Sequence, residues 1–374
     1  MSHAHFFLIG LATLILSVGA TGTAPASETI KIGVAGAHSG DLAPYGLPSL
    51  KAVQLVVKEI NDQGGIHGLP VELLVEDDGC KPELATNSAT KLVSSGVRAV
   101  IGHICSGATK AALPIYHAAK VLVISPSATA PSLNQDGEYP FFFRTIATDD
   151  IQAKTQVDFA LQTLKAGKIA VLHDKGDYGK GLAEHAQSLI EQSGKAQMVL
   201  FEGITPGAVD YSAVVQKIKR SEAEALLFGG YHPEASKLVS QMRQKRITIP
   251  LVSDDGIKND TFIKLAGKDA EGVYATGPAD VASNPATKLY REKYKQIEGT
   301  DPGAFFNNAV AAALALTNAL AKAMSADAEA VAHVLRTEKV ATPFGPITFD
   351  AKGDPVGIGF SLYQVNNGQF VQIR

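Results

Sequence analysis

Short apolar runs alternate with longer amphipathic segments along most of the chain. The first apolar run, IKIGVAG at 30–36, predicts a strand, and SLKAVQLVVKEINDQGG at 49–65 carries apolar residues at helical spacing before it ends at two glycines. The same alternation predicts further strands at 70–78, 98–104 and 121–128, and helices at 83–96 and from about 108. Continuous apolar strands separated by helices are typical of a parallel sheet covered on both faces.

The alternation starts again after FFFRTIATDD at 141–150. Apolar runs predict strands at 168–174, 196–204, 225–231, 249–256 and 272–278, with helices between them. The order then changes to three helices, a short strand and a hairpin, at 284–299, 303–323, 326–338, 345–350 and 360–374. The hairpin turns at Asn366-Asn367-Gly368. The two halves follow one α/β plan, which predicts two doubly wound lobes, each built on a parallel sheet.

The N-terminus has the pattern of a cleavable signal peptide over residues 1–26. An apolar core at 6–20 is too short for a comfortable membrane span, and Ala24-Pro25-Ala26 follows it as an A-x-A cleavage signal. A buried N-terminal helix is the competing interpretation, which the Gly/Thr/Ala/Pro-rich end of the segment disfavours. We therefore expect an exported, soluble protein that is cleaved near Ala26, since no later segment is apolar enough to span a bilayer.

Charge and cysteine content narrow the function classes. The formal net charge of the 374 residues is −3 and no basic run occurs, which disfavours nucleic acid and anionic membranes as partners. The two cysteines, Cys80 and Cys105, form an even count in an exported chain, and this favours one disulfide over free thiols.

The predicted strand ends carry the candidate chemistry. In open α/β sheets, ligands bind beyond the carboxyl ends of the strands. Small hydroxyl residues, glycines and acids gather there, in GAHSG at 36–40, HICSGAT at 103–109, SPSAT at 125–129, GGYHPE at 229–234 and SDDG at 253–256. Small hydroxyl residues that precede a helix favour an anion site, and a carboxylate would fit it.

An enzyme finds little support in the sequence. The chain has no G-x-G-x-x-G after its first strand, no G-x-S-x-G, no C-x-x-C and no H-E-x-x-H, and its ten histidines lack metal-ligand spacing. We expect neither a cofactor nor a metal. A Cys/His hydrolase built on Cys105 and His103 stays open as a competing hypothesis, although His103 and His173 are more typical of packed, hydrogen-bonded strand residues.

Several segments in order resemble the periplasmic leucine/isoleucine/valine-binding proteins of bacterial ABC transporters. They are IGHICSGAT, ISPSATAP, HDKGDYGKGLAEH, FEGITPGAVDYSA, GGYHPEASKL and AGKDAEGVYATGP, and the resemblance extends from Ile30 to Arg374. It implies the type I periplasmic binding protein fold, in which two lobes are joined by three crossing strands, and a Cys80–Cys105 disulfide. The first lobe would comprise residues 27–147 and 277–357, and the second lobe residues 148–276 and 358–374.

The resemblance also implies a role for each binding residue. Ser106 would bind the ligand carboxylate, Thr129 would contact both carboxylate and ammonium, and Ser127 or Ala128 would offer backbone groups. Asp255 stands where the family has a glutamate and would bind the ammonium. The remaining expected contacts, mostly apolar or aromatic, are Tyr45 (in place of a tryptophan), Ile104, Cys105, Tyr178, Tyr231, which would close over the ligand, and Phe305.

The expected function is that of a monomeric periplasmic receptor. It would bind a branched-chain or related aliphatic amino acid between the lobes, close around it and deliver it to a membrane permease. Donors split between two lobes are all satisfied only when the cleft is closed, so the ligand itself favours closure. A receptor of the same fold for an amide, a urea or an aromatic carboxylate is the first alternative, and an exported enzyme is the second.

Overall fold

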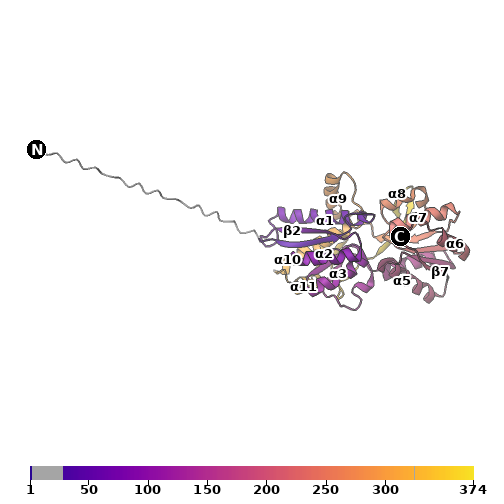
Figure 1. The fold of residues 1–374 in the computed structure, drawn as a ribbon, viewed down its shortest axis with the longest axis horizontal. Helices are drawn as coiled ribbons and strands as arrows, with labels where there is room; N and C mark the ends of the chain where they lie inside the picture. Colours follow the sequence, from indigo (N-terminus) through magenta and orange to yellow (C-terminus); the bar gives the residue numbers. More distant parts are fainter. Residues whose placement is uncertain (2–27, 324) are drawn as a thin grey trace.

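The structure, a computed structural model, describes Met1, residues 28–323 and residues 325–374. Two α/β lobes lie side by side, and the C-terminus belongs to the lobe that carries α5 to α8 (Figure 1). Apart from Met1, the expected signal peptide lies outside the described residues.

The first lobe is built on a five-stranded parallel sheet with strand order β2-β1-β3-β4-β5. Its N-terminal elements are β1 (Ile30–Gly36), α1 (Ala43–Asp62), β2 (Val71–Asp77), α2 (Pro82–Ser94), β3 (Ala99–Ile101), α3 (Ser106–Ala118), β4 (Leu122–Ser125), η1 (Pro131–Leu133) and β5 (Phe142–Arg144). The later chain adds α9 (Pro285–Glu298), α10 (Phe306–Ala323), α11 (Ala328–Thr337), β11 (Val340–Thr342) and β12 (Gly345–Ile347). Helices α1, α10 and α11 bury one face of the sheet, and α2 and α3 bury the other.

The second lobe is built on a seven-stranded sheet with strand order β14-β13-β10-β9-β8-β6-β7. Its elements are α4 (Asp149–Gln162), β6 (Lys168–His173), α5 (Asp177–Ser193), β7 (Gln197–Gly203), α6 (Ser212–Ser221), β8 (Ala225–Gly229), α7 (His232–Gln244), β9 (Leu251–Ser253), α8 (Asp260–Ala266), η2 (Gly267–Ala270), β10 (Tyr274–Pro278), β13 (Phe360–Asn366) and β14 (Gln369–Gln372). Helices α4 and α5 cover one face, and α6, α7 and α8 cover the other.

The chain passes between the lobes three times, after β5, after β10 and between β12 and β13. This arrangement confirms the predicted fold class, two doubly wound lobes joined by three crossings. The residue at which each lobe begins stays a prediction. At its edge, the second sheet is antiparallel, because the last crossing brings the predicted hairpin back beside β10 in the reverse direction.

Helix α1 begins six residues before the start that the sequence predicts, at Ala43 rather than at 49. Pro44 is its second residue, where the proline ring loses no intrahelical hydrogen bond. Two residues later the helix contacts the loop after β1, since a Cβ at Gly46 would lie 1.8 Å from the carbonyl oxygen of Ala37. These two features place Tyr45 in the first turn of α1, at the cleft between the lobes.

No single helix of residues 28–323 and 325–374 is long and apolar enough to cross a membrane. Helices α10 and α11 pass that test only together, as a pair bent by 114°. Most of α10 is buried in the core of the first lobe, where it packs against α1. Its apolar character is therefore explained by the core.

Candidate ligand-binding site

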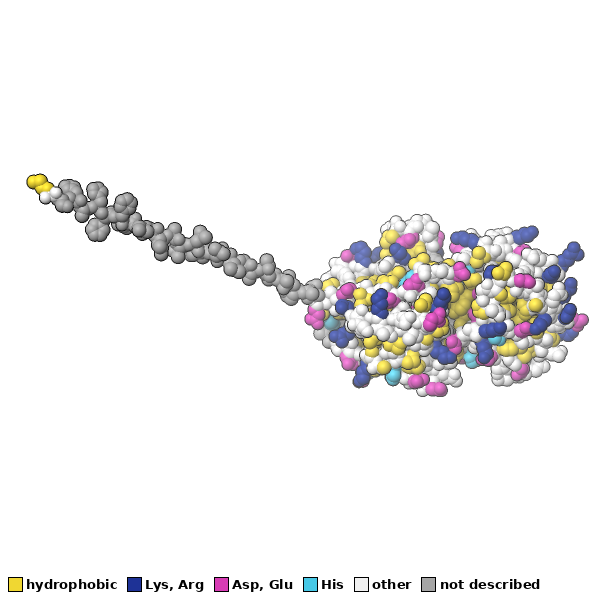
Figure 2. All heavy atoms as spheres, in the orientation of Figure 1, with side chains coloured by type: hydrophobic (Ala, Val, Ile, Leu, Met, Phe, Trp, Pro, Cys, Tyr) yellow, Lys and Arg dark blue, Asp and Glu magenta, His cyan; other side chains and the backbone are white. Residues whose placement is uncertain are grey.

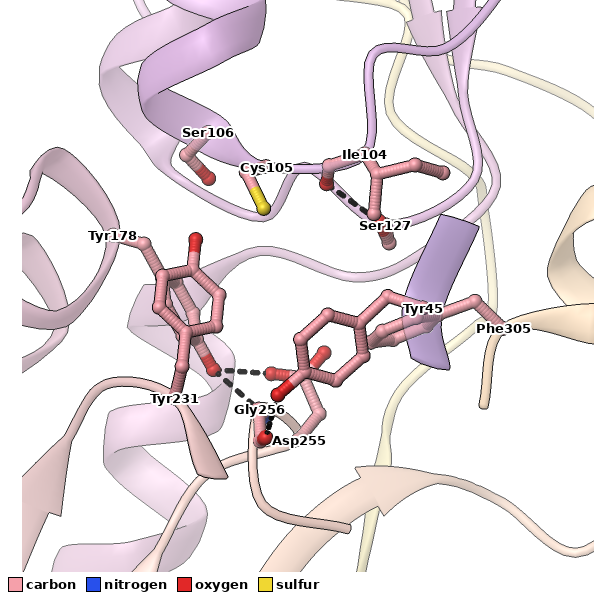
Figure 3. A pocket seen from close by; sticks show the side chains of 10 residues that line it. All are labelled: Tyr45, Ile104, Cys105, Ser106, Ser127, Tyr178, Tyr231, Asp255, Gly256 and Phe305. Carbon is pink, nitrogen blue, oxygen red and sulfur yellow. Dashed lines mark hydrogen bonds between the residues drawn. The ribbon is translucent and has the colours of Figure 1, made fainter. Parts of the chain in front are cut away.

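A cavity of about 260 Å³ lies between the two lobes, at the carboxyl ends of the strands. Figure 2 shows hydrophobic side chains gathered in the groove where the lobes meet. The residues that line the cavity are Tyr45, Ile104, Cys105, Ser106, Ser127 and Phe305 from the first lobe, and Tyr178, Tyr231, Asp255 and Gly256 from the second (Figure 3). Nine of these ten residues were predicted from the sequence, and Gly256 was not.

The first lobe offers hydroxyl groups and a helix N-terminus to the cavity. Helix α3 begins at Ser106, directly after the loop that follows β3, so the positive end of its dipole lies at the cavity wall. The hydroxyl of Ser127 donates to the carbonyl oxygen of Ile104 at 2.6 Å, and the hydroxyl of Ser106 accepts from the amide of Ala130 at 3.3 Å. This side of the cavity is suited to an anion such as a carboxylate.

The second lobe offers a carboxylate. Asp255 is 3% exposed, and burial raises the pKa of its carboxyl to about 6. Its Oδ1 accepts hydrogen bonds from the hydroxyl of Tyr178 and from Nε2 of Gln152, the latter at 3.1 Å. Backbone hydrogen bonds from Asp255 and Gly256 also favour the charged form of this carboxyl. A buried carboxylate in a residue that lines a cavity is a place for a cationic group of a ligand.

Two of the predicted contacts, Ala128 and Thr129, do not line the cavity; both are fully buried behind it. The amide of Ala128 donates to the hydroxyl of Ser125 at 2.9 Å, and its carbonyl oxygen accepts from Arg144 at 3.0 Å. Both backbone groups of Ala128 are thus already bonded. The hydroxyl of Thr129 forms no regular hydrogen bond with a described residue, but it lies close enough to the carboxyl of Asp149 to lower the pKa of that group.

Near Thr129 lies a second acid, Asp149, the first residue of α4. Asp149 is fully buried, and neither of its carboxyl oxygens has a hydrogen-bond partner among the described residues. Burial, and then the neighbouring charge of Asp255, raise the pKa of the Asp149 carboxyl well above its usual value. The neutral form of Asp149 is therefore favoured more strongly than that of Asp255.

Aromatic rings form the remaining wall. The ring centroid of Tyr45 lies 5.9 Å from that of Tyr231 and 5.8 Å from that of Phe305, and Tyr178 and Tyr231 are 5.3 Å apart. Because the rings come from both lobes, they enclose an apolar space only when the lobes are together. A wider groove, which shares Asp255 and Phe305 with the cavity, leads from it to solvent.

The cysteine and the histidine of HICSGAT do not form a catalytic pair. Cys105 is joined to Cys80 in a disulfide with a Cα–Cα distance of 5.4 Å, which confirms the predicted pairing. His103 is completely buried, with Nδ1 2.5 Å from Oδ2 of Asp78 and Nε2 3.0 Å from the hydroxyl of Tyr116. The His–Asp pair is therefore part of the packed interior, as the sequence suggested for His103. Among the described residues, no group of His, Cys, Asp or Glu could hold a metal ion.

Sequence reasoning missed three polar groups around the cavity: the carbonyl of Gly256, the amide of Gln152 and the imidazole of His232. Gly256 and His232 stand in SDDG and GGYHPE, strand-end segments that the sequence had singled out, so their position was a usable signal. Gln152 lies inside α4, and nothing in the helical pattern distinguishes it from a surface residue. Only its contact with Asp255 shows its role.

The fold and the site define a two-lobed binding protein with its ligand site between the lobes. The chain matches the periplasmic binding protein family over residues 29–369 and belongs to that family. It is 36% identical, over 91% of its length and 90% of the relative, to the leucine-, isoleucine-, valine-, threonine- and alanine-binding protein of Pseudomonas aeruginosa.

Two solved structures are similar to the whole fold. The leucine-binding protein LivK of Thermotoga maritima has a TM-score of 0.86 and 26% identity, and the match covers 92% of this chain and 98% of that chain. The branched-chain amino acid transporter substrate-binding protein LivJ of Streptococcus pneumoniae, solved with isoleucine, has a TM-score of 0.82 and 30% identity. That match covers 92% of this chain and 100% of LivJ.

Proposed function

We propose that the chain is the receptor of an ABC importer for branched-chain or related aliphatic L-amino acids. The observation that carries the proposal is the charge arrangement of the cavity: the buried carboxylate of Asp255 on one lobe lines the same cavity as the hydroxyl groups and the α3 N-terminus on the other. An amino acid zwitterion presents an ammonium and a carboxylate to these two sides. The relatives named above support the same ligand class, since one is a leucine-, isoleucine-, valine-, threonine- and alanine-binding protein and LivJ was solved with isoleucine.

Each polar group of the ligand has a partner in this proposal. Asp255 would bind the ammonium and Ser106 would bind the carboxylate. A charge-assisted hydrogen bond of this kind contributes about 1.5–3 kcal/mol. An amide, a urea or an aromatic carboxylate would leave Asp255 without a cation, so these ligand classes fit less well.

The lining of the cavity favours a small apolar side chain. Tyr45, Ile104, Tyr178, Tyr231 and Phe305 supply its apolar surface. Such a wall distinguishes ligands that differ by one methylene by about 1–3 kcal/mol, so leucine, isoleucine and valine should bind within about two decades of one another.

The wider proposal concerns transport. We infer an exported monomer without enzymatic activity that is cleaved near Ala26, acts in the periplasm and presents its closed form to a membrane permease. The three crossings near 147, 276 and 358 would act as hinges while each lobe stays rigid. Small-angle scattering should then show a smaller radius of gyration when leucine is added, and an unchanged radius at saturation would contradict closure.

Mass spectrometry of the native purified protein, followed by calorimetry, tests the ligand class. We expect a co-purified aliphatic amino acid, and binding of leucine, isoleucine and valine but far weaker binding of 4-methylvalerate, which lacks the amine. If 4-methylvalerate binds as well as leucine, Asp255 does not bind an ammonium and a carboxylate receptor is the better interpretation. Turnover of a bound compound in the mass spectra would point to an enzyme instead.

A further inference from the structure

The hydroxyl of Tyr45 joins the two lobes directly. Tyr45 belongs to α1 in the first lobe, and its hydroxyl donates to the carbonyl oxygen of Gly256, in the loop after β9 of the second lobe (Figure 3). The same hydroxyl oxygen lies 2.5 Å from Nδ1 of His232, the first residue of α7, and 3.4 Å from the backbone nitrogen of His232. All three residues are buried.

The protons of this contact can be assigned by counting. A hydroxyl has one proton, and the carbonyl of Gly256 can only accept, so the Tyr45 proton lies toward Gly256. With that proton directed at Gly256, the contact between Nδ1 and the hydroxyl oxygen is a hydrogen bond in the tautomer of His232 that carries its proton on Nδ1. Burial lowers the pKa of His232 to about 4, so the ring is neutral near pH 7, and the backbone of Asp41 in the first lobe is a further hydrogen-bond partner of the ring. Burial also raises the pKa of Tyr45 well above its usual value, which keeps the hydroxyl protonated.

Each lobe holds its half of the contact in place by itself. In the first lobe, the close approach of Gly46 to Ala37 fixes the start of α1, and the hydroxyl of Ser49 donates to the carbonyl of Tyr45 at 3.0 Å. In the second lobe, the carboxyl of Asp254 accepts from the amides of Gly230 at 2.8 Å and Gly256 at 3.1 Å. Closing the lobes therefore requires little further ordering of these groups.

A second polar contact between the lobes differs in kind. Lys110 on α3 lies 2.6 Å from Asp177 on α5, but their side chains are 55% and 39% exposed. Exposed ion pairs of this kind contribute little because water and salt screen them. The buried contact of Tyr45 is screened far less, so it has the larger effect on closure.

We propose that the Tyr45 hydroxyl, through Gly256 and His232, sets the equilibrium between the open and closed lobes and so scales the affinity for every ligand by one factor. The ring of Tyr45 lines the cavity, but its hydroxyl is used by the protein. A contact formed only in the closed state multiplies the apparent dissociation constant of each ligand equally when it is removed. The Tyr45 hydroxyl therefore sets how tightly the protein binds all of its ligands. The apolar wall of the cavity sets the order of affinity among those ligands.

The test is Tyr45→Phe, which removes the hydroxyl and keeps the ring. The ligands used are leucine, isoleucine and valine, and this choice rests on the proposed function. We expect the dissociation constant of each to rise by about 3- to 10-fold, the effect of losing a buried hydrogen bond, with the ratios between ligands unchanged within about twofold. His232→Leu should weaken binding in the same way, whereas His232→Asn, which keeps a donor near the Nδ1 position, should lose less affinity. The double variant Tyr45→Phe/His232→Leu should lose little more affinity than Tyr45→Phe alone.

Tyr211→Phe is the matched control, because the hydroxyl of Tyr211 donates to the carbonyl of Thr205 at 2.9 Å within the second lobe. It should lower the unfolding temperature and leave affinity unchanged. An unchanged affinity in Tyr45→Phe, or a change in ranking of more than about threefold, would overturn the proposal, the latter by showing that the hydroxyl contacts the ligand.

The closed fraction of the ligand-free protein gives a readout that needs no ligand. Single-molecule fluorescence with one dye on an exposed residue of each lobe should show that fraction fall by a similar 3- to 10-fold in Tyr45→Phe. If the wild-type protein binds none of the three amino acids, the proposed function fails. This measurement then still decides the role of Tyr45, and an unchanged closed fraction rejects it.

Discussion

Replacing Asp255 by asparagine should stabilise the empty protein while it weakens ligand binding. Burial raises the pKa of Asp255 from 3.8 to about 6, which corresponds to about 3 kcal/mol between the charged and neutral forms. Because the folded-state pKa is the higher one, this cost of ionisation is fully present above pH 6 and vanishes below about 3.8. Asparagine has no charge, and its Oδ1 can still accept from Tyr178 and Gln152.

The bound state should respond in the opposite direction. With Asp255→Asn, the ligand ammonium loses its anionic partner in a desolvated cavity, which typically costs about 2–5 kcal/mol. That loss corresponds to a drop in leucine affinity of at least ~30-fold. The same substitution should raise the free energy of unfolding of the ligand-free protein by up to about 3 kcal/mol at neutral pH, and by less if the open lobes admit water to the site.

Denaturant unfolding of the ligand-free protein and leucine calorimetry measure these two effects on one variant. Asp150→Asn is a suitable control because it removes an exposed acid next to the buried Asp149. It should change neither the free energy of unfolding nor the leucine affinity by much. Two results would refute the reasoning. Unchanged leucine affinity in Asp255→Asn would remove Asp255 from the site, and a destabilised ligand-free variant would show that the carboxylate is not strained in the empty cavity.

Three further predictions concern the same site and its support. Leucine affinity should be constant above pH 6 and fall by up to tenfold per pH unit below it, as a proton competes with the ammonium for Asp255; calorimetry showing equal affinity at pH 7 and pH 5 would contradict this. Ser106→Ala should weaken leucine binding by about 1–3 kcal/mol, less than Asp255→Asn, since the backbone donors of α3 remain, and the same titration checks the order. Titration of unfolded, unreduced protein should find no free thiol, and replacing both Cys80 and Cys105 by serine should lower the free energy of unfolding by about 3 kcal/mol in denaturant melts.

Much of the fold could be predicted from local pattern. The alternation of short apolar runs with amphipathic segments requires a covered parallel sheet, and the change of order after about residue 280 marks the chain's return to the first lobe. The carboxyl ends of parallel strands meet at one edge of a sheet, so segments such as HICSGAT and SDDG converge without any knowledge of side-chain contacts. The resemblance to the family then singled out particular residues within those segments.

Local pattern did not show which of these residues face the cavity. Ala128 and Thr129 follow β4 as directly as Ser127 does, yet the turn directs them into the interior, where Ser125 and Arg144 occupy the backbone groups of Ala128. The early start of α1 was also hidden, because Pro48, which normally would suggest a break, lies inside the helix rather than before it.

The sequence by itself predicted a signal peptide and determined the two-lobed α/β plan and the strand ends that line the cavity, because these depend on periodicity and on short segments. Only the tertiary structure decided how groups from the two lobes meet. Tyr45 reaches His232 and Gly256 across 187 and 211 residues of chain, and the pKa of Asp255 depends on its burial and on hydrogen bonds from Tyr178 and Gln152, which lie 77 and 103 residues away. Burial and contact across such separations arise only when the whole chain is packed, so no local pattern encodes them.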